Sequence, residues 1–145
     1  MGFVHANIRL TNEDDLAAQR RGQPVSRIRQ ENVRVLVDSG ALNLVLTPDM
    51  QSLLELPVLR RQRVVTADGR RTECDLVGPV RVEFANRSTI CEAVVLPGAQ
   101  ECLLGAIPIE GMDVFIDPTR RQLIVNPDSP DLPSCLVATA RSETA

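Results

Sequence analysis

The amino-acid sequence predicts an all-β fold, mainly strands with one or two short helices, in a single domain. Three observations support this prediction. Short apolar runs recur about every 10 residues, and Gly, Pro, Asn or Asp separates them. The 145 residues suffice for one core, and 43% of them are hydrophobic. The aromatic residues are three phenylalanines, so the core is expected to be aliphatic.

Composition and charge argue against several classes of partner and cofactor. The net charge is -3, and the 16 basic residues, all arginine, are scattered, which does not fit a nucleic-acid surface. No apolar run has the length of a membrane span and no signal peptide precedes the first strand, so we expect a cytoplasmic protein without a membrane partner. The four cysteines lie far apart without C-x-x-C spacing, which predicts neither a metal site nor a disulfide framework, and we expect no cofactor.

The first elements are expected to be a strand and a charged insertion. Residues 3–10 alternate apolar and polar side chains, as in a half-buried strand. Residues 11–22 carry helix signals: Thr11 as a cap, acids in the first turn, arginines in the last and Gly22 at the end. The alternative, a solvated excursion that joins two strands, is the favoured interpretation. Either way, a charged insertion with helical character is expected at about residues 11–30.

The remaining residues predict short strands with turns between them. Residues 33–37 and 42–46 are strand-like, and residues 47–56 form a short helix with Thr47 as its cap, Pro48 at its first position and Pro57 as its stop. Hairpins are predicted at residues 61–78, 80–97 and 114–125, and an apolar run at 101–109. Residues 1–127 are thus expected to form the domain, and residues 128–145 a loosely ordered tail.

Asp38 is the residue whose position calls for a chemical explanation. It follows the apolar run Val35–Val37 and precedes another, where an ionised carboxylate is costly to desolvate. Ser39 and Gly40 form a turn, and the glycine lets another chain segment approach closely. Far downstream, the motif Leu103–Gly105 can pack beneath that turn. On spacing alone, Asp38 would be a turn former whose side chain bonds its own backbone.

Taken together, the two motifs resemble the signature of the retropepsin-like aspartic proteases. That signature is two apolar residues, Asp, Thr or Ser, Gly and a small residue, and it corresponds here to Leu36-Val37-Asp38-Ser39-Gly40-Ala41. The later apolar-apolar-Gly motif corresponds to Leu103-Leu104-Gly105. A flap-like hairpin at Val64–Val80 separates the motifs, and a helix-like piece near Ile107–Met112 follows. The resemblance covers roughly Val33–Val125. The small bacterial clan AA aspartic proteases are similar also in their N-terminal strand and charged insertion.

The resemblance implies a retropepsin-like half-barrel that dimerisation completes. Aspartic proteolysis uses two carboxylates that share one proton, because one acts as a base on water while the other donates to the scissile carbonyl. The chain carries one such motif, so an active enzyme would be a homodimer with Asp38 of each protomer in the dyad. It would be an endopeptidase that acts on peptides or proteins without metal or cofactor, with an acidic to near-neutral pH optimum.

The resemblance also implies roles for the neighbouring residues. The Ser39 hydroxyl would bond across the dimer, and Gly40 would allow the close approach. Further support of the active site would come from Ala41, Leu103, Leu104 and Gly105, and substrate contact, by position in the flap, from Ala67, Asp68 and Gly69.

Two departures from the family pattern keep other functions open. The flap tip is charged, with one glycine and no aromatic residue, and Ala106 follows Gly105 where viral members carry a polar residue. The alternative is therefore a catalytically silent dimerisation or peptide-binding module, and a third possibility is a purely structural homodimer. A Ser-His or Cys-His enzyme is not expected, because the single histidine, His5, lies in the first strand and no G-x-S-x-G motif is present.

Overall fold

The structure is a computed structural model that describes residues 2–137, and it confirms the mainly-β prediction. Twelve elements follow one another along the chain: β1 (Val4–Asn12), α1 (Glu13–Arg20), β2 (Gln30–Val37), β3 (Leu44–Leu46), α2 (Pro48–Leu54), β4 (Val58–Val65), β5 (Arg71–Phe84), β6 (Arg87–Val95), β7 (Leu103–Leu104), α3 (Ala106–Met112), β8 (Val114–Asp117) and β9 (Gln122–Val125). The last eight residues of the expected tail, 138–145, lie outside the described part of the chain.

Six strands close into a ring, and a seventh extends it. The order in the main sheet is β1-β2-β7-β3-β6-β5-β4, and β1 pairs additionally with β5, so the ring closes between them. β4 lies outside the ring, on the far side of β5. Buried aliphatic side chains from β1, β2, β3, β5 and β7 fill the interior, among them Leu10, Val35, Leu44, Val82 and Leu104, each 0% exposed. The predicted aliphatic core is thereby confirmed.

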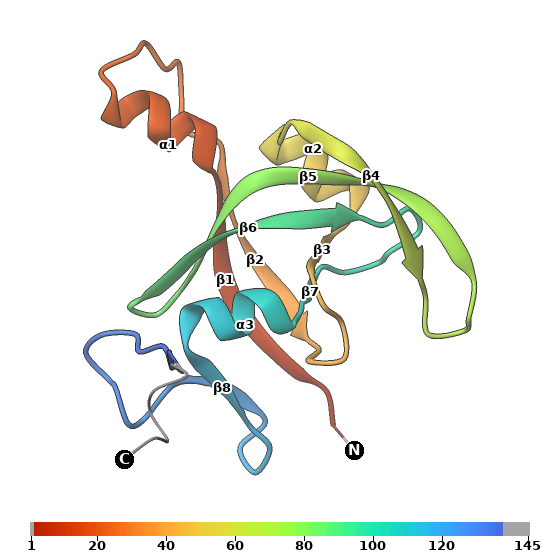
Figure 1. Ribbon diagram of the computed structural model, residues 1–145, viewed down its shortest axis with the longest axis vertical. Coiled ribbons are helices and arrows are strands. Elements are labelled where there is room, and N and C mark those ends of the chain that lie inside the picture. Colours follow the sequence, from red (N-terminus) through yellow and green to blue (C-terminus); the bar gives the residue numbers. More distant parts are fainter. Residues whose placement is uncertain (1, 138–145) are drawn as a thin grey trace, which may run out of the picture.

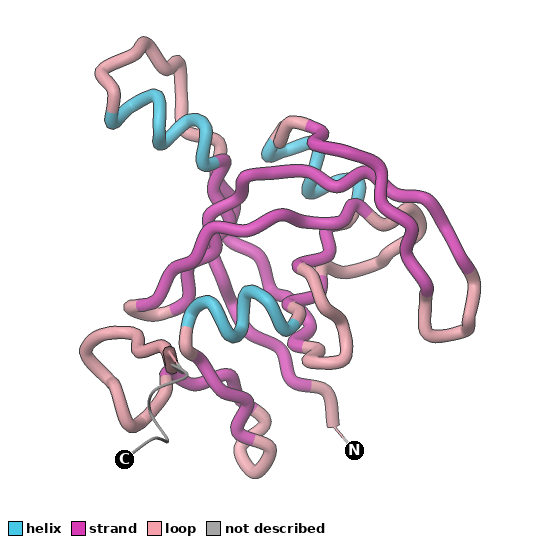
Figure 2. The backbone as a smooth tube through the Cα atoms, viewed as in Figure 1, coloured by secondary structure: helices cyan, strands magenta, loops and turns pink. Residues whose placement is uncertain are grey.

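β4 and β5 leave the ring together as a long hairpin (Figures 1 and 2). The hairpins predicted at residues 61–78 and 80–97 are both present, but they share one 14-residue strand, β5. A register shift between Val77 and Val80 interrupts the pairing of β5 with β6 where the two predicted hairpins were divided. We call the part of this hairpin from Arg61 to Cys74 the flap.

The insertion between β1 and β2 is helical, and α1 projects from one end of the molecule (Figure 1). The predicted cap residue was wrong. Thr11 remains in β1 opposite Gln30, and the cap is Asn12, whose side-chain oxygen accepts from the backbone N–H of Asp15 at 3.3 Å. Asn12 also donates to the Leu54 carbonyl at 3.0 Å. This second bond ties the start of α1 to the end of α2. Asn12, rather than Thr11, therefore connects the two helices.

Ion pairs hold the base of α1 against the ring. Asp15 accepts two bonds from the Arg29 guanidinium, at 2.7 and 2.9 Å, and a third from the Arg29 backbone N–H at 2.9 Å. Glu13 accepts from Arg81 of β5 at 2.8 and 3.1 Å and from Arg20 at 3.1 Å. Both acids are buried, and such paired, charge-assisted bonds are the strong ones. The favoured interpretation as a solvated excursion therefore fails for the first turn of the insertion.

These pairs predict that acid weakens the fold. The bond from Arg81 holds the pKa of Glu13 below its ordinary 4.5, and the bond from Arg29 holds the pKa of Asp15 below its ordinary 3.8. A carboxyl with a lowered folded-state pKa stabilises the protein above its unfolded-state value and loses this contribution as the pH falls through the folded-state value. We expect the free energy of unfolding, measured in urea, to fall as the pH drops below about 4.5.

In Asp15→Asn this acid-induced fall should be smaller. The matched control is Asp14→Asn, because Asp14 is the exposed neighbouring residue in the same helix and forms no ion pair with a described residue. Equal pH profiles for the two variants would contradict the role of the Asp15 pair.

Candidate active site

Asp38 lies at the end of β2, where main-chain hydrogen bonds fix its turn. Its backbone N–H donates to the Leu104 carbonyl at 2.9 Å, and its own carbonyl accepts from the Ala41 N–H at 3.1 Å. The carboxylate oxygen Oδ1 accepts from the Gly40 N–H at 2.9 Å. Asp38 is therefore a turn former, as its spacing predicted, and Oδ2 makes no hydrogen bond to the residues that the structure describes. One oxygen orients the group, and the other is available for chemistry.

The motif Leu103–Gly105 packs directly against this turn, as predicted. β7 runs parallel to β2, with Leu104 opposite Val37, and antiparallel to β3. Gly105 then passes so close to the turn that a Cβ on it would lie 2.2 Å from the Asn43 carbonyl oxygen and 2.7 Å from that of Ala41. These distances are far inside van der Waals contact, so no residue with a side chain fits there.

The start of α3 holds the other side of the same loop. The Ala106 N–H donates to the Ala41 carbonyl at 2.8 Å, and the Ile107 N–H donates to the Leu42 carbonyl at 2.9 Å. These bonds explain why β3 begins at Leu44 rather than at Leu42, where the strand was predicted. The carbonyls of residues 41 and 42 serve a helix start instead of a strand.

A cleft of about 740 Å³ separates this loop from the flap. Asp38, Gly40 and Ala41 line it on one side, and residues 62–67 of the flap line it on the other. Its walls are largely apolar, and its remaining lining residues are Leu42, Asn43, Val45, Val94, Leu96 and Leu103. Asp38 is the one carboxylate among the described residues that line the cleft.

The sequence-predicted site residues are only partly brought together here. Of the three flap residues, Ala67 lines the cleft, whereas Asp68 and Gly69 do not. The Asp68 carboxylate accepts instead from the Thr66 hydroxyl and from the backbone and side chain of Arg70, and these bonds lower its pKa. Asp68 thus shapes the flap tip. Ser39 is exposed, and its hydroxyl bonds none of the described residues.

Sequence reasoning missed the cleft walls. Gln62 and Val64 enter from β4 and Val94 and Leu96 from β6 and the residue after it. The position of β4 beside the cleft depends on its register with β5, in which Gln62 lies opposite the buried Cys74. No local signal in the sequence specifies that register.

Three of the four cysteines, Cys74, Cys91 and Cys102, are in a form unsuited to catalysis or metal binding. Burial raises the pKa of Cys91 to about 12, and it also raises the pKa values of Cys74 and Cys102. A nucleophile or metal ligand would be the thiolate, which these surroundings disfavour. Within residues 2–137, no three His, Cys, Asp or Glu side chains lie close enough to hold a metal ion.

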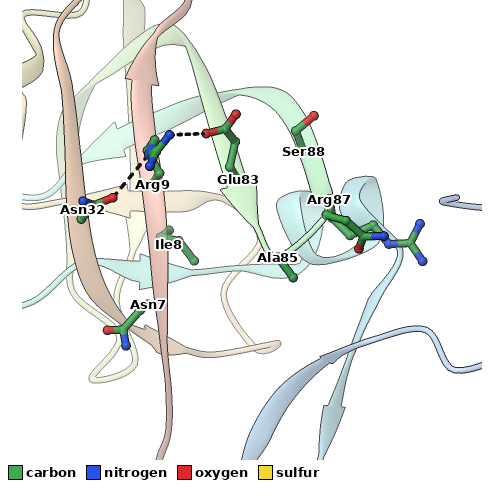
Figure 3. Close-up of a pocket in the computed structure, with 9 residues that line it drawn as sticks. Asn7, Ile8, Arg9, Asn32, Glu83, Ala85, Arg87 and Ser88 are labelled. Atoms are coloured by element: carbon green, nitrogen blue, oxygen red, sulfur yellow. Dashed lines mark hydrogen bonds and ion pairs between the residues drawn. The ribbon is translucent and has the colours of Figure 1, made fainter. Parts of the chain in front are cut away.

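A second cavity, of about 490 Å³, lies between β1, β2 and the β5–β6 hairpin (Figure 3). Arg9 spans it, 3.4 Å from the Asn32 side-chain oxygen and 3.8 Å from Glu83. The Arg9 guanidinium and the Glu83 carboxylate are already paired with each other, and the Arg87 guanidinium extends away from the other lining side chains. This cavity therefore offers no reactive group.

Among the described residues, no helix is long and apolar enough to cross a membrane.

Comparisons with known proteins agree with the geometry of the Asp38 site. The family model described as aspartyl protease matches residues 26–107, more than half of the chain. The chain belongs to this aspartyl protease family. Among solved structures, it is similar to the retroviral protease-like domain of Ddi1 from Leishmania major, with a TM-score of 0.54 and 16% sequence identity over 88% of this chain and 90% of that chain. The similarity concerns the fold and confirms the predicted retropepsin-like architecture. No curated protein matches the sequence.

The packing of Gly105 yields a stability prediction. Gly105→Ala should lower the free energy of unfolding by about 3 kcal/mol, because backbone atoms must move to admit the methyl group. Gly98→Ala is the control: a Cβ there meets nothing within 4 Å, and its cost comes from the positive φ of 83° alone, about 1 kcal/mol. If urea unfolding gives the same decrease in the free energy of unfolding for both variants, the loop at residues 41–43 can move to admit the methyl group, and the prediction is wrong.

Proposed function

We propose that the protein is an aspartic endopeptidase that works as a homodimer, with Asp38 of each protomer forming the catalytic dyad. The observation that carries this proposal is the placement of Asp38. Its turn is fixed by main-chain bonds at the edge of a cleft, opposite a flap, and no second carboxylate from the described residues lines that cleft. In this proposal, a second copy of the chain supplies the other carboxylate.

The chemistry follows from two carboxylates held together. Like charges so close cannot both ionise, so the pair retains one proton. The ionised member removes a proton from water, which attacks the scissile carbonyl, and the protonated member donates to the carbonyl oxygen. Bonds from Gly40 to Asp38 and from Asp38 to Leu104 keep each carboxylate oriented without help from neighbouring side chains. The apolar walls exclude water from a bound peptide.

Exposed apolar side chains surround the proposed two-fold contact. Leu42 is 65% exposed, and Ile107, whose backbone bonds Leu42, is 43% exposed. Phe3 is 77% exposed, and the β1–β2 register places it at the end of β1 beside the end of β2. Such a patch next to the incomplete dyad fits a self-complementary interface. Ser39, exposed in the same turn, would bond the partner turn.

The first test of this function is Asp38→Asn. We expect cleavage of a peptide library between pH 3 and 7 by the wild type, and a loss of at least about 100-fold in kcat for the variant, because a neutral amide cannot share the dyad proton. Asp49→Asn, in the exposed first turn of α2 and outside the cleft, should keep full activity.

Equal activity of Asp38→Asn and the wild type would exclude the shared-proton mechanism. A wild type that binds peptides, forms dimers and cleaves nothing would favour the peptide-binding module instead. The flap tip suits this second function. The Asp68 carboxylate bonds Thr66 and Arg70 within the tip and is therefore not free to contact a substrate.

The dimer has its own test in Ile107→Glu. The variant brings two carboxylates and their hydration into the proposed contact, and we expect its dimer dissociation constant in analytical ultracentrifugation to rise at least about tenfold. Leu53→Glu is the control, because Leu53 is 50% exposed on α2 and does not line the cleft. Unchanged association of Ile107→Glu would place the interface elsewhere.

A further inference from the structure

We propose that the segment Asn126–Ser134, here called the C-terminal strap, positions the active-site loop, and that Asp113 is the positioning residue that fastens it. This inference rests on the proposed function for its effect on catalysis. Its structural part, a coupling between the strap and the loop at Asp38, rests on hydrogen bonds and packing that do not depend on that function.

Asp113 fastens the strap with four hydrogen bonds. Its carboxylate accepts from the Ser134 backbone N–H at 2.8 Å and hydroxyl at 3.0 Å, from the Ser129 hydroxyl at 2.9 Å and from the Asn126 side chain at 3.0 Å. The Ser134 N–H, together with these side chains, lowers the pKa of Asp113 to about 2. The ionised carboxylate is therefore bound more tightly than the neutral acid, and the strap depends on its charge.

The turn between β5 and β6 holds the strap from the other side. Asn86 donates to the Pro130 carbonyl at 2.9 Å, and Arg87 donates through Nη2 to the Ser129 carbonyl. Figure 3 shows the Arg87 guanidinium directed away from the cavity beside it. Arg87 is 2% exposed, and its Nε and Nη1 atoms have no partner among the described residues.

Closing the strap over Arg87 therefore has an opposing cost. A buried guanidinium with unpartnered N–H groups loses hydration that it does not recover. The bonds to Asp113 offset this cost. The loss of the Asp113 bonds would therefore leave this cost without compensation, and the strap would open more often.

α3 connects the strap to the active-site loop. Asp113 is the residue at the C-terminal end of α3, and Ala106 and Ile107 at its start bond the carbonyls of Ala41 and Leu42. The helix has seven residues and is therefore about 10 Å long. Gly111 of α3 lies on Thr89 of β6, where a Cβ would come within 2.6 Å of the hydroxyl oxygen. A shift at one end of so short and closely packed a helix must move the other end.

The test compares Asp113→Asn with Asp128→Asn in the full chain. Both variants lose one negative charge from the same region, but the Asp128 side chain is exposed and bonds none of the described residues. We expect Asp113→Asn to raise the hydrogen-exchange rates of the Ser134, Ala106 and Ile107 amides, measured by NMR, about tenfold. We also expect kcat for peptide cleavage to fall about tenfold with KM within about twofold, because alignment and not substrate binding is lost. Asp128→Asn should match the wild type in every measurement.

Two outcomes would overturn the proposal. If Asp113→Asn leaves the Ser134 amide protected, Asp113 does not fasten the strap. If the Ser134 amide exchanges faster while Ala106 and Ile107 are unchanged, the strap does not act on the loop. Hydrogen exchange is measured without substrate, so it tests the coupling even if the wild type cleaves no peptide. The absence of cleavage would contradict the proposed function alone.

If Asp113→Asn does not fold, two double variants of the strap serines test the same coupling. Ser129→Ala/Ser134→Ala removes two of the strap hydroxyls and should reproduce the faster exchange, and Ser129→Thr/Ser134→Thr, which keeps the hydroxyls, should restore the wild-type rates. Equal exchange of Ala106 and Ile107 in the alanine and threonine pairs would overturn the proposal.

Discussion

The close contact between Gly105 and the loop at residues 41–43 is the constraint on which the site depends. Because residue 105 has no side chain, its backbone can lie against the carbonyls of Ala41 and Asn43. The two-residue strand β7 can then lie between β2 and β3, where it completes the ring, and α3 can start at once and bond the same loop. One short segment thereby fixes the barrel and the orientation of Asp38 together.

The site is built mainly from backbone groups, and this explains its position in so apolar a neighbourhood. Asp38 follows a buried strand, yet its carboxylate lies at the cleft and receives the Gly40 N–H. A turn that is held by main-chain bonds needs no polar side chains beneath it. Aliphatic residues can therefore fill the space under Asp38, and because Asp38 is only half-buried and lines the cleft, the desolvation of its carboxylate is partial.

Local chemistry made much of this predictable. The Asp38 turn, the helix that begins at Thr47 and Pro48, and the flap tip at Asp68–Gly69 each depend on residues close together in the sequence. Errors arose where a distant partner decides. Asn12 replaces Thr11 as the helix cap because it also reaches Leu54, and the network around Asp113 joins residues up to 21 positions apart. The cleft walls depend on strand register, which no local signal specifies.

The insertion at α1 has a practical consequence. Its base is tied to the ring through Asp15 and Glu13, whereas most residues after the helix, such as Gly22, Gln23 and Ser26, are exposed. This loop projects from the end of the molecule opposite β8 (Figure 1). It is thus a natural attachment point for a fluorophore, an affinity tag or an inserted domain, because its exposed residues do not line the cleft and ion pairs hold its base to β5 and to the start of β2.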